Sequence, residues 1–457
     1  MIDRDEVIAK ARDLDIHEAN VQRDYVFGWL IGGLYTASAL RDILVLKGGN
    51  ALRKAYFPMT RFSGDLDFST TQGLSRELLL AHFNDICRFA EVQSGVKFDL
   101  GRNQIVDVQF IDPDKRVYKM RLYFRDFSGT ENEITLKVKV DVVEHDRIYL
   151  PIQTRRLIHP YSDAEDCNFQ IRVVKLEEAL ADKMRCLLQR RYSYDLFDLV
   201  YAVFINRDLD INRKEAVATF LRKTIFEPSP VAARNLLLGV PYDLMRGFWG
   251  KVICPRASRF SFDQALALLR DGLVALFEPF SYGAERAAAY FRAELRNQIM
   301  DAGNSLTLLR LTYDGVPRLI EPYSLAFKRR RDGAAQEYLY AWDRSGGRSG
   351  EVGIRSFLPW KVESLANTDE KFEPRFEVEI SRAGDRGVAG YFGKPFSRTT
   401  RAILARRRVR LASRRTYKVQ CPYCGKVFSR QTSSTSLRPH TDGYGNRCYG
   451  KVGIRIF

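Results

Sequence analysis

A short segment of the chain places two glycines and two aspartates where they could hold a phosphorylated ligand and a metal ion. In LVLKGGNALRKAYFPMTRFSGDLDFST, Gly48 and Gly49 follow an apolar stretch, and Asp65 and Asp67 lie near the end. Without side chains at the glycines, the backbone N–H groups of a following helix can approach a phosphate closely, and Asn50 could cap that helix. Residues i and i+2 of a strand face the same side, so the two carboxylates project together. Such a pair repels unless a cation such as Mg²⁺, which prefers carboxylate and phosphate oxygens, lies between them.

A third carboxylate and a hydroxyl extend the predicted site. The segment EITLKVKVDVVE alternates strictly, which places Asp141 on the polar face of a strand, and Ser63 lies two residues before Asp65. The alternative interpretation is that the glycines only end a strand and the aspartates only face solvent. Either pattern alone would favour that alternative, but their order, together with Asp141, favours a site. We therefore predict that Asp65, Asp67 and Asp141 hold Mg²⁺.

Hydrophobic patterning predicts the elements that must position these residues. ILVLKG and GDLDFST are typical of strands, and NALRKAYF between them is typical of a helix. Farther along, Leu176, Leu180, Met184 and Leu187 recur at helical spacing, and helical patterns continue to about residue 280. Short strands and turns then dominate. We expect an α+β unit with a helical C-terminal half, followed by a small β domain.

Four soft ligands near the C-terminus have the spacing of a zinc site. Cys421 and Cys424 are separated by two residues, and His440 and Cys448 follow. Two ligands on a tight turn and two on a returning segment describe a tetrahedral Cys₃His site. Reduced cysteines without metal are the alternative, but the clustering of four such ligands favours Zn²⁺. With four protein ligands the metal would be structural.

The net charge of +17 favours an acidic partner, and most of the excess lies in the C-terminal tail. Residues 401–457 contain 14 lysines and arginines and a single acid, Asp442. We interpret this tail as a region that contacts RNA or DNA, with a solvated basic surface as the alternative. The tail residues predicted to contact nucleic acid are Arg406, Arg407, Arg408, Lys426 and Arg430.

Composition also bears on the compartment. No apolar run approaches the roughly 18 residues that indicate a membrane span, and the polar N-terminus is unlike a signal peptide. The seven cysteines do not have the distribution of a disulfide framework, which suits a reducing compartment. We expect a cytoplasmic protein with no membrane partner.

Four motifs in order resemble the AbiEii-type nucleotidyltransferase toxins of abortive-infection toxin–antitoxin systems: KGGNALRKAY, RFSGDLDFS, KVDVV and KLEEALADKMRCLLQRRYSYDLFDL. The resemblance covers about residues 20 to 280. It implies a polymerase-β-like core that transfers a nucleotide from an NTP, in some relatives to the 3′ end of tRNA. The residues that match the phosphate-binding motif and the metal-binding acids are Gly48, Gly49, Ser63, Asp65 and Asp67.

The last of these motifs carries two further candidate residues. Lys183 matches a helical lysine placed to contact NTP phosphate, and Asp198 matches the second acid of an Asp-Leu-Tyr/Phe-Asp-Leu motif whose first acid is Asp195. Without the resemblance, a solvated lysine and an acidic helix start would be the ordinary interpretations. Relatives carry arginine before the first acid, whereas this chain has Tyr194, so Arg190 or its neighbour at position 191 could take that place.

The β domain resembles the WYL domain, an Sm-like barrel of bacterial regulators and defence proteins, over about residues 303 to 375. Glu337 replaces the tryptophan of the namesake Trp-Tyr-Leu. The resemblance implies ligand sensing or nucleic-acid contact, for which Arg355 and Lys361 supply cations, and Tyr323 and Tyr338 could supply stacking faces. Aromatic residues of a small barrel are more often part of its core, so we favour Arg355.

We therefore predict a metal-dependent nucleotidyltransferase toxin-like effector of a toxin–antitoxin or phage-defence system, acting on an RNA (tRNA 3′ end favoured) or a protein, with a cognate antitoxin as partner. The alternative is a non-enzymatic nucleic-acid-binding regulator that works through its C-terminal half. The predicted organisation is a nucleotidyltransferase domain at 1–280 (core about 20–205, helical part about 206–280), a helical linker at 281–304, a WYL-like domain at 305–385, a basic connector at 386–415 and a zinc finger at 416–457.

Overall fold

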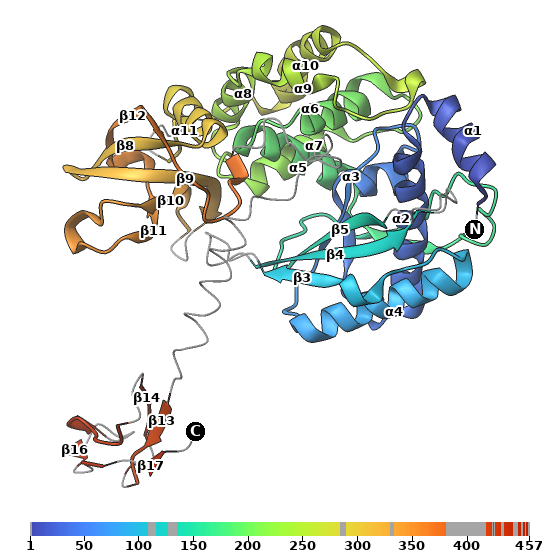
Figure 1. Cartoon of the computed structure of the whole chain (residues 1–457). Coiled ribbons are helices and arrows are strands. Elements are labelled where there is room, and N and C mark those ends of the chain that lie inside the picture. The colour runs from blue at the N-terminus through green and yellow to red at the C-terminus, as the bar shows by residue number, and fades with distance from the viewer. Residues whose placement is uncertain are drawn as a thin grey trace. The chain divides into compact units, whose positions relative to one another are not determined.

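The computed structural model of the chain forms two compact units, Met1–Val388 and Ala389–Phe457 (Figure 1). The predicted basic connector, with Arg406, Arg407 and Arg408, lies outside the described residues. The structure describes residues 2–107, 116–126, 135–283, 289–329, 333–380, 417–422, 424, 426–430, 434–441, 447–448, 451–452 and 454–455.

A seven-stranded sheet lies in the N-terminal part of the first unit, and its strands have the order β3-β4-β5-β2-β1-β7-β6. Figure 1 labels β3, β4 and β5 of this sheet. The pairs β2–β5 and β1–β7 are parallel, and the other pairs are antiparallel. The predicted strands ILVLKG, GDLDFST and EITLKVKVDVVE are confirmed as β1, β2 and β5. The strands are Val45–Lys47 (β1), Asp65–Ser69 (β2), Gln104–Asp107 (β3), Val117–Arg125 (β4), Thr135–Val143 (β5), Gln153–Arg156 (β6) and Gln170–Val173 (β7).

Helices flank this sheet, and helices also make up the segment between its last strand and about residue 280, as the sequence predicts. No helix of the described residues is long and apolar enough to cross a bilayer. The helices are Arg4–Leu14 (α1), Glu18–Ala37 (α2), Gly48–Ala51 (α3, continued by a π-helical turn over Leu52–Tyr56), Arg76–Ser94 (α4), Leu176–Gln189 (α5), Ser193–Val200 (α6, continued by a π-helical turn over Tyr201–Ile205), Arg213–Lys223 (α7), Pro230–Leu238 (α8), Arg246–Trp249 (α9), Phe262–Phe277 (α10) and Ala293–Ser305 (α11).

One face of the sheet carries the apolar residues that pack with α2 and α4. Leu136, Val138, Val140 and Val142 of β5 are buried in a core that these two helices share. The alternate residues of β5 are half-buried on the opposite face, because side chains of a strand alternate between faces. Asp141 belongs to this second face, which therefore remains available for a site.

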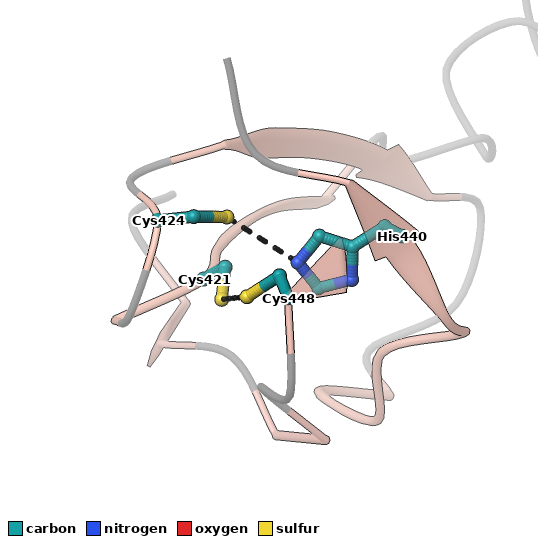
Figure 2. A group of neighbouring side chains, drawn as sticks. All are labelled: Cys421, Cys424, His440 and Cys448. Carbon is teal, nitrogen blue, oxygen red and sulfur yellow. Dashed lines mark hydrogen bonds between the residues drawn. The ribbon is translucent and has the colours of Figure 1, made fainter. Parts of the chain in front are cut away.

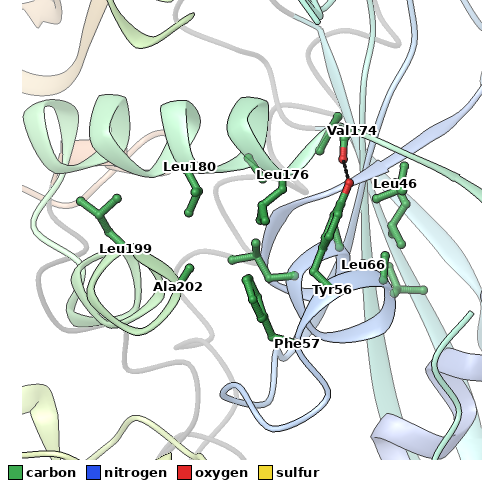
Figure 3. Packing of buried hydrophobic residues seen from close by; sticks show 14 of the residues in the cluster. Leu46, Tyr56, Phe57, Leu66, Val174, Leu176, Leu180, Leu199 and Ala202 are labelled. Carbon is green, nitrogen blue, oxygen red and sulfur yellow. Dashed lines mark hydrogen bonds between the residues drawn. The ribbon is translucent and has the colours of Figure 1, made fainter. Parts of the chain in front are cut away.

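The strands that carry the candidate site share a hydrophobic core with the helical half (Figure 3). Leu46 of β1 and Leu66 of β2 pack in the same cluster as Leu180 of α5. The hydroxyl of Tyr56 donates to the carbonyl of Val174 at 2.7 Å, which ties the turn after α3 to the chain just before α5. Burial of this kind contributes about 25 cal/mol for each Å² of apolar surface, so it fixes β1 and β2 against α5.

A second, antiparallel sheet in the order β11-β10-β9-β8-β12 packs against α11. Glu337, at the position of the namesake tryptophan, is buried, and its carboxylate accepts from Arg296 at 2.6 Å. The predicted β region is confirmed as this sheet, whereas the WYL resemblance and barrel closure remain predictions. The strands are Thr307–Tyr313 (β8), Val316–Arg329 (β9), Ala335–Asp343 (β10), Gly353–Phe357 (β11) and Val362–Lys371 (β12).

The second unit contains short strands around a small cluster of cysteine and histidine side chains. β13 pairs antiparallel with β14 and β17, and β15 pairs with β16. Val419, Cys421 and Leu437 are its buried apolar residues among those described. The strands are Tyr417–Gln420 (β13), Val427–Arg430 (β14), His440–Thr441 (β15), Arg447–Cys448 (β16) and Ile454–Arg455 (β17).

Candidate active site and metal-binding cluster

The two glycines are required by the close approach of side chains from β2 and the loop before it. Gly48 has a φ of +73°, and a Cβ there would lie 2.1 Å from Oδ2 of Asp67. A Cβ on Gly49 would lie 2.7 Å from Oγ of Ser63. Both distances are below van der Waals contact, so any side chain would displace these groups. The structure thus brings together the glycines, Ser63 and Asp67, as the sequence predicts.

The three predicted metal-binding aspartates lie on adjacent strands. In the pairing of β2 with β5, Asp67 is directly opposite Asp141. Ser63 donates from Oγ to Asp65 Oδ1 at 2.9 Å. The side-chain amide of Asn50 donates to the carbonyl of Asp65 at 2.5 Å. The expectation that Asn50 caps the helix is wrong, because Asn50 lies inside α3 and its side chain holds β2 instead.

The electrostatics of this cluster fit a divalent cation. Burial, followed by the charges of Asp65 and Asp141, raises the pKa of Asp67 to about 7, while Lys47 and Lys183 oppose the rise. Neighbouring carboxylates repel one another when all are ionised, and a cation bound between them removes this repulsion. Hard carboxylate oxygens at this position are the ligands that Mg²⁺ takes. These residues therefore fit the metal that the sequence predicts.

Lys183 and Asp198, predicted to act in catalysis, belong to a buried network of charges. Asp198 accepts from Arg61 Nε and Nη2, both at 2.7 Å, and from Lys183 Nζ at 2.7 Å. Lys183 also reaches Asp195 at 3.0 Å, and Arg190 Nε donates to the same carboxylate at 2.8 Å. Burial opposes its charged form, but Asp198 and Asp195 outweigh that effect and raise the pKa of Lys183. The ammonium group is therefore held between two carboxylates.

Arg61 is a member of this network that sequence reasoning missed. Its guanidinium lies 2.8 Å from the position of a Cβ on Gly49 and 4.9 Å from the ring centroid of Tyr194. The tyrosine that replaces the family's arginine thus packs on an arginine from another motif. Arg190 supplies the cation beside Asp195. The sequence did offer one indication of this role, because Arg61 directly precedes the Phe-Ser-Gly-Asp segment that carries the candidate site residues.

The four predicted zinc ligands converge in the second unit (Figure 2). Their ligand atoms all lie within 4.8 Å of one another. Sγ of Cys421 lies 3.7 Å from Sγ of Cys448, and Sγ of Cys424 lies 3.3 Å from Nε2 of His440. A Zn–S bond of about 2.3 Å gives a tetrahedral S–S edge of about 3.8 Å, so the spacing fits Zn²⁺.

The histidine of this cluster is oriented for metal binding. Nδ1 of His440 lies 2.9 Å from the carbonyl of Arg438. A carbonyl can only accept, so we assign the proton to Nδ1, which leaves Nε2 as the metal-facing nitrogen. The ring also contacts Phe428 edge to face at 4.9 Å between centroids. The second unit therefore offers a complete Cys₃His donor set.

The residues predicted to contact nucleic acid are dispersed. Arg355 lies on β11 near Glu351, and Nζ of Lys361 pairs with Asp314 at 2.5 Å. Tyr323 belongs to the core of its sheet, in keeping with the preference for Arg355 over the tyrosines, because its ring is buried and its hydroxyl donates to Glu321 at 2.8 Å. In the second unit Lys426 is exposed beside β14, the strand that ends at Arg430.

Comparison with family models supports two of the predicted modules. Residues 31–251 match the nucleotidyl transferase AbiEii toxin model of type IV toxin–antitoxin systems, which confirms the predicted resemblance over this range. Residues 409–442 match the BED zinc finger, so that match contains Cys421, Cys424 and His440 and ends before Cys448. The first unit thus carries an AbiEii-type nucleotidyltransferase segment, and the second carries a zinc-finger-like one.

The solved structures that are similar to the chain include a toxin from Mycobacterium tuberculosis and a protein from Helicobacter pylori. MenT4, a nucleotidyltransferase toxin from Mycobacterium tuberculosis H37Rv, is 20% identical with a TM-score of 0.39, and the match covers 61% of this chain and 90% of that one. JHP933 from Helicobacter pylori is 16% identical with a TM-score of 0.36, covering 57% of this chain and 94% of that one. No curated protein matches the sequence.

Proposed function

We propose that the first unit transfers a nucleotide from an NTP to an acceptor, using divalent metal held by Asp65, Asp67 and Asp141. The observation that carries the proposal is the arrangement around Asp67. Its carboxylate fills the space left by the missing side chain of Gly48, lies opposite Asp141, and has a pKa raised to about 7. The family match over residues 31–251 supports the same activity.

The protein's own groups would bind and orient the reactants. Gly48, Gly49 and Ser63 would hold the NTP phosphates at the start of α3. A bound Mg²⁺ would lower the pKa of an acceptor hydroxyl and would stabilise the leaving pyrophosphate. In the proposed transfer, the acceptor oxygen would bond to the α-phosphorus of the NTP, and the bond from that phosphorus to the α,β-bridging oxygen would break. Pyrophosphate would leave, and the proton of the acceptor hydroxyl would pass to water.

We propose that Lys183 and Asp198 act mainly by positioning. The Asp198 carboxylate holds Arg61, and Arg61 lies against the Gly49 turn and just before Ser63. Lys183 holds Asp198 in turn and contributes positive charge near Asp67. This network would keep the phosphate-binding turn in place when NTP binds.

The setting would be a toxin–antitoxin system with an antitoxin as partner, as for the type IV toxins whose family residues 31–251 match, or else a phage-defence system. RNA is the favoured acceptor, with the 3′ end of tRNA as the first candidate and a protein as the second. We assign Zn²⁺ to Cys421, Cys424, His440 and Cys448, in a structural role. The zinc-finger-like unit, with Lys426 and Arg430, would bring nucleic acid to the protein.

The purified chain should therefore be incubated with each radiolabelled NTP, Mg²⁺ and total bacterial RNA, and resolved on a denaturing gel. We expect a labelled tRNA-sized band that disappears in the Asp65→Ala, Asp67→Ala double variant. Label on protein alone would identify a protein acceptor. An absence of label from folded, zinc-loaded protein would refute the enzymatic proposal and favour the nucleic-acid-binding regulator.

A further inference from the structure

One face of β4 and β5 carries a row of cationic residues that begins beside the candidate metal site. Met120 and Leu122 of β4 are buried in the core, so the alternate residues of β4 face the other way, as Asp141 does. Strand pairing sets Lys119 opposite Asp141, Arg121 opposite Lys139, and Tyr123 opposite Lys137. We call Arg121, Tyr123, Lys137 and Lys139 the basic strip.

The strip concentrates like charges that a fold would otherwise avoid. Arg121 and Lys139 face each other directly across the strand pair, and like charges in that position are destabilising. Burial, then Arg121 and Lys139, lower the pKa of Lys137. Within the described part of the chain, Lys139 forms no ion pair, and the one ion pair of Arg121 is with Asp141, at 4.0 Å. Nη1 of Arg121 also donates to the carbonyl of Met120 at 2.8 Å. A polyanion lying on the strip would relieve this repulsion.

An aromatic side chain is interleaved with these cations. Tyr123 is half-buried on the strip, and the guanidinium of Arg102 lies 4.5 Å from its ring centroid. Aromatic rings beside arginines are the surfaces on which bases of single strands stack. The strip thus offers charges for phosphates and a ring for a base, which an acidic peptide would not need.

The strip is also in line with the metal-binding acids. Lys139 and Lys137 precede Asp141 at two-residue steps along β5, so Lys137 lies about 13 Å from Asp141 at about 3.3 Å per residue. At the near end, Lys119 is already bonded to the carboxylate of Glu377. Lys119 is therefore left out of the basic strip, which extends away from the acids along β5.

We propose that the basic strip binds the phosphodiester backbone of a single-stranded acceptor, whose end is then presented to Asp65, Asp67 and Asp141. The acceptor role rests on the proposed nucleotidyl transfer, whereas binding to the strip does not. Arg121, Lys137 and Lys139 would contact phosphates, and Tyr123 would stack on a base.

The test is binding of a fluorescein-labelled single-stranded RNA of about 12 nucleotides to the full chain, without NTP, followed by anisotropy over a range of salt concentrations. For single strands, each phosphate contact contributes about 0.7 to the slope of log K against log salt. Lys137→Gln with Lys139→Gln should therefore reduce the slope by about 1.4. The matched control, Lys214→Gln with Lys371→Gln, changes two exposed lysines away from β4 and β5 and should leave the slope unchanged.

A second measurement locates the RNA. Photo-cross-linking with 4-thiouridine should label peptides from residues 117–125 and 135–143. Equal slopes in the strip and control variants, or cross-links confined to 389–457, would overturn the inference. Strip-dependent binding without nucleotide incorporation by the unmodified protein would instead refute the proposed transfer and leave the binding surface standing. The same assay with single-stranded DNA of equal length separates RNA from DNA.

Discussion

Replacing Asp198 by asparagine should destabilise the first unit strongly. The carboxylate is 1% exposed and accepts from Arg61 twice and from Lys183 once, each at 2.7 Å. An amide keeps one acceptor oxygen but turns an NH₂ group toward a buried cation. Removing one partner of a buried ion pair typically costs about 3–5 kcal/mol, a large part of a total stability of about 5–15 kcal/mol.

Urea unfolding of the full chain, followed by far-ultraviolet circular dichroism, measures this loss. The matched control is Asp263→Asn, because Asp263 pairs with Arg246 at 2.8 Å while their side chains are 73% and 48% exposed. A pair of that kind is screened by water, so we expect no measurable change. The same chemical substitution thus separates a buried role from an exposed one.

A double-mutant cycle that combines Asp198→Asn with Lys183→Met then measures the coupling energy between these two residues. Contacting residues of one network usually show coupling of about 0.5–3 kcal/mol, and we expect a value in the upper half of that range. Unchanged stability of Asp198→Asn, with nucleotide incorporation abolished, would refute our reasoning and give Asp198 a direct chemical role.

Three further results are expected. The ordinary pKa of Asp67 is 3.8, and in the folded protein it is about 7. Between these two values the folded state therefore binds more protons than the unfolded state does. Without Mg²⁺, the free energy of unfolding should thus fall as the pH rises from about 4 to 7. Thermal unfolding measured across this pH range should show a weaker pH dependence of stability in Asp67→Asn than in the unmodified protein. Gly48→Ala should abolish nucleotide incorporation because the Cβ would strike Asp67, whereas Gly64→Ala, with nothing within 4 Å, should retain it. Cys424→Ser should lower the zinc content measured by atomic absorption, and Cys254→Ser should not.

The local pattern of the sequence predicts the centre of the site well. The glycines, the Asp-x-Asp pair and the alternation around Asp141 each depend on two or three neighbouring residues, and the structure joins them as expected. Arg61 and Asp198 could not be paired from the sequence, because 137 positions separate them and only tertiary packing brings them together. Glu337 was equally hidden, since a carboxylate is normally exposed unless a partner such as Arg296 accompanies it into the core.

The basic strip shows a second limit. Alternation alone placed Lys137 and Lys139 on the polar face of their strand, but it could not show that Arg121 lies opposite one of them. Strand register is set by pairing across the sheet, and a shift of one residue would send Arg121 to the apolar face. The strip therefore became visible only once β4 and β5 were aligned.

The end of α5 has a consequence for how this protein can be divided. Arg191 is 1% exposed and pairs with Asp301 of α11 at 2.5 Å, and Arg296 donates to the carbonyl of Leu188 at 2.8 Å while it holds Glu337. A fragment that stops at residue 280 would strip these partners from the last turn of the helix that carries Lys183. We expect such a fragment to aggregate. The part of the chain before residue 280 therefore does not fold independently, and we expect it to occur together with the second sheet in related proteins.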